Sequence, residues 1–129
     1  MTPLPVRLLP QQDLRVALEA LLAAQGEAAA FVLQGIGSLS VARLRPAGRS
    51  DAFELRGDLE ILTLAGTLSP DGAHLHASVS DADGNVTGGH VERGCIVRTT
   101  AEILVLLLPG HSFSREMDPL SGFKELRIG

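Results

Sequence analysis

The apolar residues of this chain follow a helical period only once, close to its start. Leucine and alanine side chains at positions 14, 17, 18, 21 and 22 share one face of a helix. Asp13 stands where an N-cap is expected, and Gly26 stands where a helix commonly ends. Before this helix, residues 4–9 predict a short strand that Pro10 stops.

Beyond Gly26 the pattern is that of strands and turns. Strands are predicted over residues 29–34, 38–45, 53–68, 73–80, 86–97, 100–108 and 123–128, and the segment 53–68 is one strand or two with a break near Gly57. The run 103–108 is apolar at every position, which predicts a strand covered on both faces. The chain is therefore expected to form one α+β domain, residues 1–129, in which about seven mostly antiparallel strands pack with one main N-terminal helix.

Composition adds two constraints. Because 45% of the residues are hydrophobic but only 3% are aromatic, the core must be aliphatic, and the apolar excess indicates a surface buried between subunits. The net charge of −4, without any basic run, argues against nucleic-acid binding, which depends on neutralising phosphates.

The single cysteine and the N-terminal segment bear on the cellular compartment. Cys95 has no partner for an internal disulfide, and its apolar neighbours predict an inert, buried thiol. The first residues lack the pattern of a secretory signal, and no apolar run approaches the ~18 residues that cross a bilayer. A cytoplasmic protein without a membrane span is expected.

Three histidines concentrate the site-like chemistry of the sequence. His74 and His76 alternate with Leu75 in a strand pattern, so the two imidazoles share one face roughly 7 Å apart along the strand. His90 follows Gly88-Gly89, which lets the backbone pass close to a neighbour. Three imidazoles with an open fourth position form a known zinc arrangement. A site for a divalent metal, zinc first, or for a small ligand is one interpretation, and a hydrogen-bonded structural cluster is the other.

Two glutamates are candidates to support such a site. Glu60 and Glu102 could act as additional ligands or orient the histidines. Glu102 directly precedes the apolar run, where a buried carboxylate needs a partner, and Arg98 and Arg115 are the candidates. His111 has no matching partner in sequence and is expected to be a loop residue.

Other motifs carry no function in this interpretation. Gly35-Ile36-Gly37 lacks the third glycine of a dinucleotide loop and precedes a strand pattern, so it predicts a turn between two strands. Residues 81–85 lack the spacing of a calcium loop and predict a solvated turn. No nucleophile paired with a base is evident, so no catalytic residue and no enzymatic activity are assigned.

Taken in order, the motifs resemble the PPC domain, the plant- and prokaryote-conserved domain, nearly from end to end. The resemblance rests on Arg7-Leu8-Leu9-Pro10, Asp13-Leu14, Gly35-Ile36-Gly37-Ser38-Leu39, Ala42-Arg43-Leu44, residues 60–68, His74-Leu75-His76, Gly84, Gly88-Gly89-His90, Gly94 and Thr100-Ala101-Glu102. The chain departs from the pattern at Gln11, where a glycine is usual, and at Ala65, where a serine is common.

The resemblance implies a homotrimer of sheet-and-helix protomers, with the histidine motifs clustered near a subunit boundary. Plant members carry a separate AT-hook for the minor groove, and this chain has no such Arg-Gly-Arg-Pro motif. A trimer with a histidine-lined pocket that binds a metal or small ligand is therefore the first expectation. The alternative is a DNA-binding or transcription-associated protein that acts through the trimer, and this alternative rests on family analogy.

Overall fold

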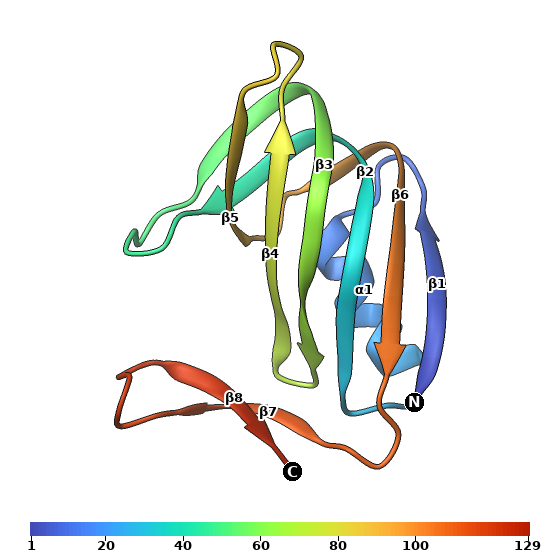
Figure 1. The fold of residues 1–129 in the computed structure, drawn as a ribbon, viewed down its shortest axis with the longest axis vertical. Coiled ribbons are helices and arrows are strands. Elements are labelled where there is room, and N and C mark those ends of the chain that lie inside the picture. Colours follow the sequence, from blue (N-terminus) through green and yellow to red (C-terminus); the bar gives the residue numbers. More distant parts are fainter.

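The computed structural model describes residues 1–129, which form one helix, a six-stranded antiparallel sheet and a two-stranded hairpin (Figure 1). The elements are β1 (Thr2–Leu8), α1 (Leu14–Ala24), β2 (Ala30–Arg45), β3 (Phe53–Ser69), β4 (Gly72–Ser80), β5 (Val86–Val91), β6 (Ile96–Leu107), β7 (Phe113–Met117) and β8 (Lys124–Ile128). The predicted α+β class, with one helix and a mainly antiparallel sheet, is confirmed.

The large sheet has the strand order β1-β6-β2-β3-β4-β5, and it curls so that β5 also pairs with the end of β2. The edge strand β1 carries Pro3 and Pro5 and pairs only with β6. The hairpin β7–β8 lies apart, below the ends of β3 and β4 in the view of Figure 1. This arrangement leaves the lower part of β4, residues 72–75, paired with β3 but not with β5.

The helix begins and ends where the sequence predicts. The carboxylate of Asp13 accepts a hydrogen bond from the backbone N–H of Val16 at 3.0 Å, as an N-cap does. The other oxygen of Asp13 accepts the N–H of Gly94 at 2.7 Å, which ties the start of the helix to the β5–β6 turn. Gly26, just past the helix, has a φ of 67°, the left-handed conformation typical of this position.

The predicted turn at Gly35-Ile36-Gly37 is wrong, because β2 runs unbroken through it. A side chain at Gly37, where φ is 149°, would collide with the carbonyl of Thr100 on β6. The register between β2 and β6 shifts just beyond this point. The glycine therefore allows a close approach between two strands at a bulge, a use of glycine that resembles a turn signal in sequence.

Three further segments refine the predicted strands. The segment predicted as 86–97 divides at the turn around Gly94, whose φ is 105°, so that β6 begins at Ile96. The strand β7 was not predicted, and it pairs with β8, the strand expected near residues 123–128. The segment 53–68 resolves into one strand, β3, which passes through Gly57.

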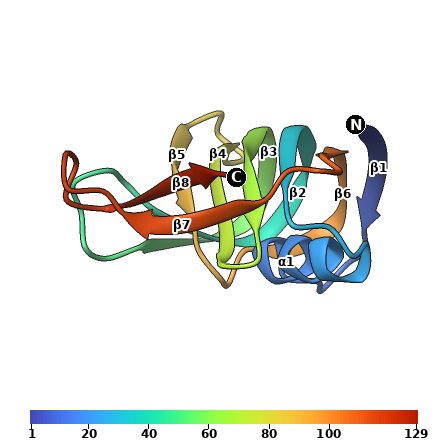
Figure 2. The same ribbon diagram turned by 90° about the horizontal axis from the view of Figure 1, so that it is seen from below.

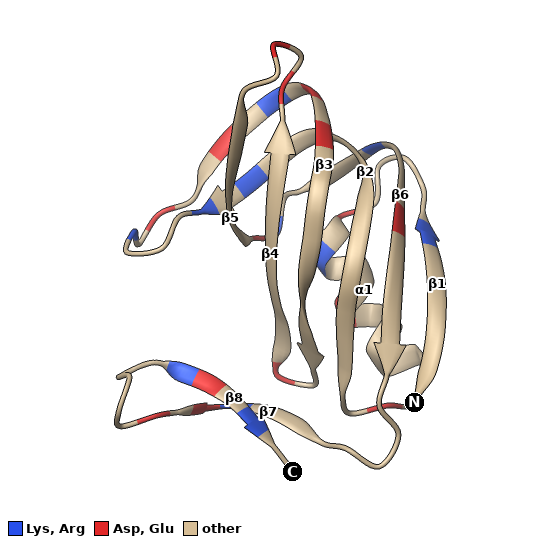
Figure 3. Cartoon of the chain, in the orientation of Figure 1, with Lys and Arg blue, Asp and Glu red and all other residues tan.

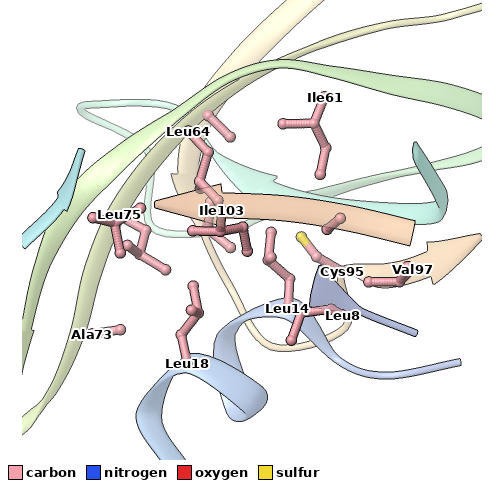
Figure 4. Packing of buried hydrophobic residues seen from close by; sticks show 14 of the residues in the cluster. Leu8, Leu14, Leu18, Ile61, Leu64, Ala73, Leu75, Cys95, Val97 and Ile103 are labelled. Carbon is pink, nitrogen blue, oxygen red and sulfur yellow. The ribbon is translucent and has the colours of Figure 1, made fainter. Parts of the chain in front are cut away.

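The core lies between α1 and the sheet and is aliphatic, as the composition predicts. Its 24 clustered residues include no aromatic side chain. Figure 4 shows Leu14 and Leu18 of α1 facing Leu75, Val97 and Ile103 of the sheet. Seen from below in Figure 2, α1 covers only one face of the sheet.

The opposite face of the sheet is apolar and uncovered in the single chain. Five large side chains on it are between 37% and 51% exposed: Phe31, Leu33, Ile36, Leu62 and Leu104. Figure 3 shows no charged residue along β4 or along the lower parts of β2 and β3. The expectation that residues 103–108 are covered on both faces is therefore wrong for the single chain, because buried Ile103 and Val105 alternate with the exposed Leu104.

Neither of the expected ion partners of Glu102 pairs with it in the single chain. Glu102 lies on the uncovered face and is exposed, so its carboxylate does not need a buried partner. Arg98 instead pairs with Asp58 at 3.0 Å.

The structure contains no helix with the length and apolarity that a bilayer-spanning helix requires.

Candidate metal centre

His74, His76 and His90 come together on the uncovered face of the sheet. One nitrogen from each imidazole lies within 4.8 Å of the nitrogens from the other two. The ring centroids are separated by 5.0 Å for His74 and His76, 5.4 Å for His74 and His90, and 4.6 Å for His76 and His90. The three side chains therefore face a common point from two adjacent strands.

The alternation of β4 explains the position of the first two histidines. Leu75 and Ala77 are buried in the core, so His74 and His76 must project from the other face. His76 stands directly opposite His90 in the antiparallel register of β4 and β5. Opposed residues in such a pair have Cβ atoms about 4.5–5.5 Å apart, which brings the third imidazole beside the first two.

Glycine at position 89 brings β5 close to the end of β2. A Cβ at Gly89 would lie 2.8 Å from the carbonyl oxygen of Arg45, closer than a side chain tolerates. The approach sets His90 opposite Arg45 in the β2–β5 register. The motif that the sequence singled out therefore positions a histidine and an arginine together.

The surroundings favour the neutral form of two of the imidazoles. Burial lowers the pKa of His74, and the Arg115 guanidinium and the two neighbouring imidazoles lower it further. Burial likewise lowers the pKa of His90, with additional contributions from Arg45 and His76. A neutral imidazole keeps the nitrogen lone pair that a metal needs, so both side chains are in the ligating form near neutral pH.

The two candidate glutamates lie outside the cluster. Glu60 is opposite Ser80, at the end of the β3–β4 ladder away from the pair Ala65 and His76. Glu102 is on β6, and two strands, β2 and β3, separate β6 from β4. Neither carboxylate belongs to the group whose atoms could share one ion. His111 is an exposed residue between β6 and β7, in agreement with its assignment to a loop.

Cys95 is buried, and its thiol has the raised pKa of an unreactive cysteine, as its sequence context predicts. Burial raises the pKa of its thiol to about 11. Its sulfur accepts the backbone N–H of Arg43 at 3.2 Å and donates to the carbonyl oxygen of Arg43 at 3.3 Å. At neutral pH the thiol therefore stays protonated, and Cys95 is not among the three residues whose ligand atoms could share one ion.

Charged residues lie beside the histidines, and the sequence does not predict them there. Glu92 accepts hydrogen bonds from Arg15 on the helix at 3.3 Å and from Arg45 on β2 at 3.2 Å. Arg115 on β7 is held by its backbone N–H, which donates to Asp71 at 2.9 Å. Pro46 marks the end of a strand and so indicates that Arg45 lies at a strand end. No sequence signal places Arg115 beside the histidines, because its position depends on how the hairpin β7–β8 packs below the sheet.

Comparison with known proteins places this geometry in a family. A profile of the Plants and Prokaryotes Conserved (PCC) domain matches residues 1–109. The bifunctional protein GlmU of Synechococcus sp. strain JA-2-3B'a(2-13) is 49% identical over 124 residues, which are 96% of this chain. The same match covers 20% of GlmU, so the chain spans about a fifth of the length of this curated relative.

Several solved structures share the whole fold. A hypothetical protein from Salmonella enterica superposes with a TM-score of 0.95 at 40% identity, covering 99% of this chain and 93% of that one. A metal-containing protein from Archaeoglobus fulgidus has a TM-score of 0.83 at 28% identity, covering 97% and 92%. A protein from Ralstonia eutropha, named only as a candidate DNA-binding protein, has a TM-score of 0.82 at 25% identity, covering 97% and 90%.

Proposed function

Because this chain belongs to the Plants and Prokaryotes Conserved domain family, we propose that it works as a homotrimer in which the histidine cluster holds a divalent metal, with zinc as the first candidate. The observation that carries the metal proposal is the convergence of His74, His76 and His90, whose ligand nitrogens lie within 4.8 Å of one another. A similar protein from Archaeoglobus fulgidus is described as metal-containing, which supports the proposal.

The cluster suits zinc in its chemistry and its dimensions. Nitrogens bound to zinc at about 2.0–2.1 Å in a tetrahedron lie about 3.3 Å apart. The present nitrogens lie within 4.8 Å of one another, so each pair would have to approach by at most about 1.5 Å to reach that spacing. Three protein ligands leave a fourth position free, which would let the metal polarise or hold a further ligand.

The uncovered sheet face supports the trimer. A groove of about 530 Å³ crosses this face between β1, β6 and β2, and Ile36 and Leu104 line it. Arg7 and Glu102 also line the groove, carry opposite charges and make no ion pair in the protomer. A second copy can cover the apolar residues and pair both charges, which is the pattern of an interface between identical subunits.

Metal analysis of the untagged protein tests the centre. We expect about one zinc per protomer by elemental mass spectrometry, and we expect His74→Ala and His90→Ala to lose it. His111→Ala is the matched control, since this exposed histidine lies outside the cluster. A wild-type protein that neither contains metal nor binds added zinc, cobalt or nickel would remove the metal proposal and leave the trimer proposal standing.

A second candidate function is DNA binding by the assembled trimer. The observation in its favour is the similarity to the candidate DNA-binding protein of Ralstonia eutropha. The net charge of −4 opposes it, because a phosphate-binding surface normally requires a cationic excess. Titration with duplex DNA at several salt concentrations separates the two candidates. A steep loss of affinity with salt would support phosphate contacts, whereas no binding at low salt would exclude this function for the chain.

A further inference from the structure

A small cavity of about 280 Å³ opens beside the histidine cluster, at the part of β4 that β5 leaves unpaired. His74 and His90 both line it. Its charged lining consists of four cationic side chains, Arg15, Arg45, Arg115 and Lys124, and two carboxylates, Asp71 and Glu92. The lining therefore carries a net charge of +2, although the whole chain carries a net charge of −4.

The two carboxylates are already engaged, so they do not cancel all four cations. The carboxylate of Glu92 forms ion pairs with Arg15 and Arg45, at 3.3 Å and 3.2 Å. Asp71 accepts the backbone N–H of Arg115 and makes no ion pair. No carboxylate lies within ion-pair distance of Arg115 or Lys124.

Both arginines nearest the histidines are held in place but keep free N–H groups. Arg45 uses Nε for Glu92 and Nη1 for the carbonyl of Arg49 at 3.1 Å, which leaves its Nη2 unused. Arg115 uses Nη2 for the carbonyl of Lys124 at 2.9 Å, which leaves its Nε and Nη1 unused. A guanidinium has five N–H donors in a planar fork that matches the oxygens of a carboxylate or phosphate.

We propose that this cavity binds a small oxyanion, a carboxylate or phosphate group, which occupies the free position of the metal while Arg45 and Arg115 bind its remaining oxygens. The inference rests on the proposed metal centre and adds the chemical class of its ligand. A divalent ion on three neutral imidazoles keeps its full charge, so metal and guanidiniums together form a strongly anion-selective site. A volume of about 280 Å³ lies just below the usual range of ligand cavities, so the ligand is small.

The ligand would also connect two separate parts of the fold. Arg45 ends β2 in the large sheet, whereas Arg115 belongs to the hairpin β7–β8, which lies outside that sheet (Figure 1). An oxyanion held by both guanidiniums bridges the sheet and the hairpin. Binding should therefore change the coordination of the metal and also protect the hairpin amides from hydrogen exchange.

Cobalt(II) substitution gives the test a direct optical signal. The protein is loaded with cobalt, and its visible absorption is followed while inorganic phosphate or malonate is added in separate titrations. We expect a saturable spectral change with at least one of the two anions. The variants R45Q and R115Q should bind that anion roughly tenfold to a hundredfold more weakly while still binding cobalt. The control R98Q, which changes an arginine paired with Asp58 outside the cavity, should match the wild type.

The outcomes separate this inference from the proposed function. If the wild type does not bind cobalt, the metal proposal and this inference both fail. If cobalt binds but neither anion changes the spectrum, or if R45Q and R115Q bind the anion as well as R98Q does, only this inference fails. A response to phosphate alone or to malonate alone supports the site and assigns the group that it recognises.

Discussion

Replacement of Ile36 by aspartate is expected to dissociate the proposed trimer and to leave the single chain folded. Ile36 lies on the uncovered face of β2 and is 51% exposed in the single chain, so the change removes little from the core. In a trimer that covers this face, the same position would be buried. Within the single chain the new carboxylate would stand opposite Glu102 in the β2–β6 register, but both side chains are exposed there, so the fold is expected to tolerate the repulsion.

The size of the effect follows from the exposed half of the side chain. Full burial of an isoleucine contributes about 1.5–3 kcal/mol, so burial of the remaining half contributes about 1 kcal/mol per protomer. An unpaired polar group at a buried position costs roughly 1–3 kcal/mol more. The sum is about 2–4 kcal/mol per protomer, or about 6–12 kcal/mol for three copies.

That energy translates into a large change in the concentration at which the trimer dissociates. Each 1.4 kcal/mol is about a factor of ten in an equilibrium constant. For a monomer–trimer equilibrium the concentration of half-dissociation varies with the square root of the dissociation constant. We therefore expect it to rise at least about a hundredfold.

Sedimentation velocity over a wide dilution series measures this directly, with circular dichroism to show that the protomer stays folded. Val16→Asp is the matched control, because Val16 is 45% exposed but lies on α1, on the other side of the sheet. The reasoning is refuted if the wild type sediments as a single protomer. It is equally refuted if Ile36→Asp remains trimeric at the concentrations where the control does.

Three other predictions concern stability and reactivity. Without metal, the lowered pKa values of His74 and His90 mean that the unfolded chain binds more protons than the folded one. The free energy of unfolding in EDTA should therefore be steady above about pH 7 and fall as the pH drops through the ordinary histidine value, and urea titrations that show no such fall would contradict the shifts. Leu18→Ala, at a fully buried position of α1, should lower the free energy of unfolding by about 2–5 kcal/mol in urea at fixed protein concentration, whereas a loss below 1 kcal/mol would mean that the helix packs loosely. Cys95, with its pKa raised to about 11, should react with iodoacetamide in the native state far more slowly than in urea, and equal rates would show that the thiol is accessible.

The parts of the fold that depend on local pattern were predictable from the sequence. The period of the apolar residues and the cap at Asp13 define α1 without reference to any neighbour. Strict alternation on β4 likewise sets Leu75 and Ala77 inward and the histidines outward. For the same reason the pairing of His74 with His76 on one face could be read directly from the sequence.

The remaining features depend on contacts between distant segments. Whether Gly37 makes a turn or a bulge is decided by the approach of Thr100 on β6, more than sixty residues later in the chain. The opposition of His76 and His90 depends on the register of β4 and β5, which a one-residue slip would destroy. Arg115 reaches the cavity only because the hairpin folds back beneath the sheet, and no periodicity encodes that return.

The prolines of β1 have a consequence for how this molecule avoids uncontrolled self-association. Pro3 and Pro5 lie on the outermost strand of the sheet, and each lacks the amide hydrogen that an incoming strand would need for extension of the ladder. At the other border, β5 closes onto β2 instead of presenting a full free rim. Both features disfavour strand addition at these two borders of the large sheet, and they leave its exposed apolar face available for a finite, closed assembly.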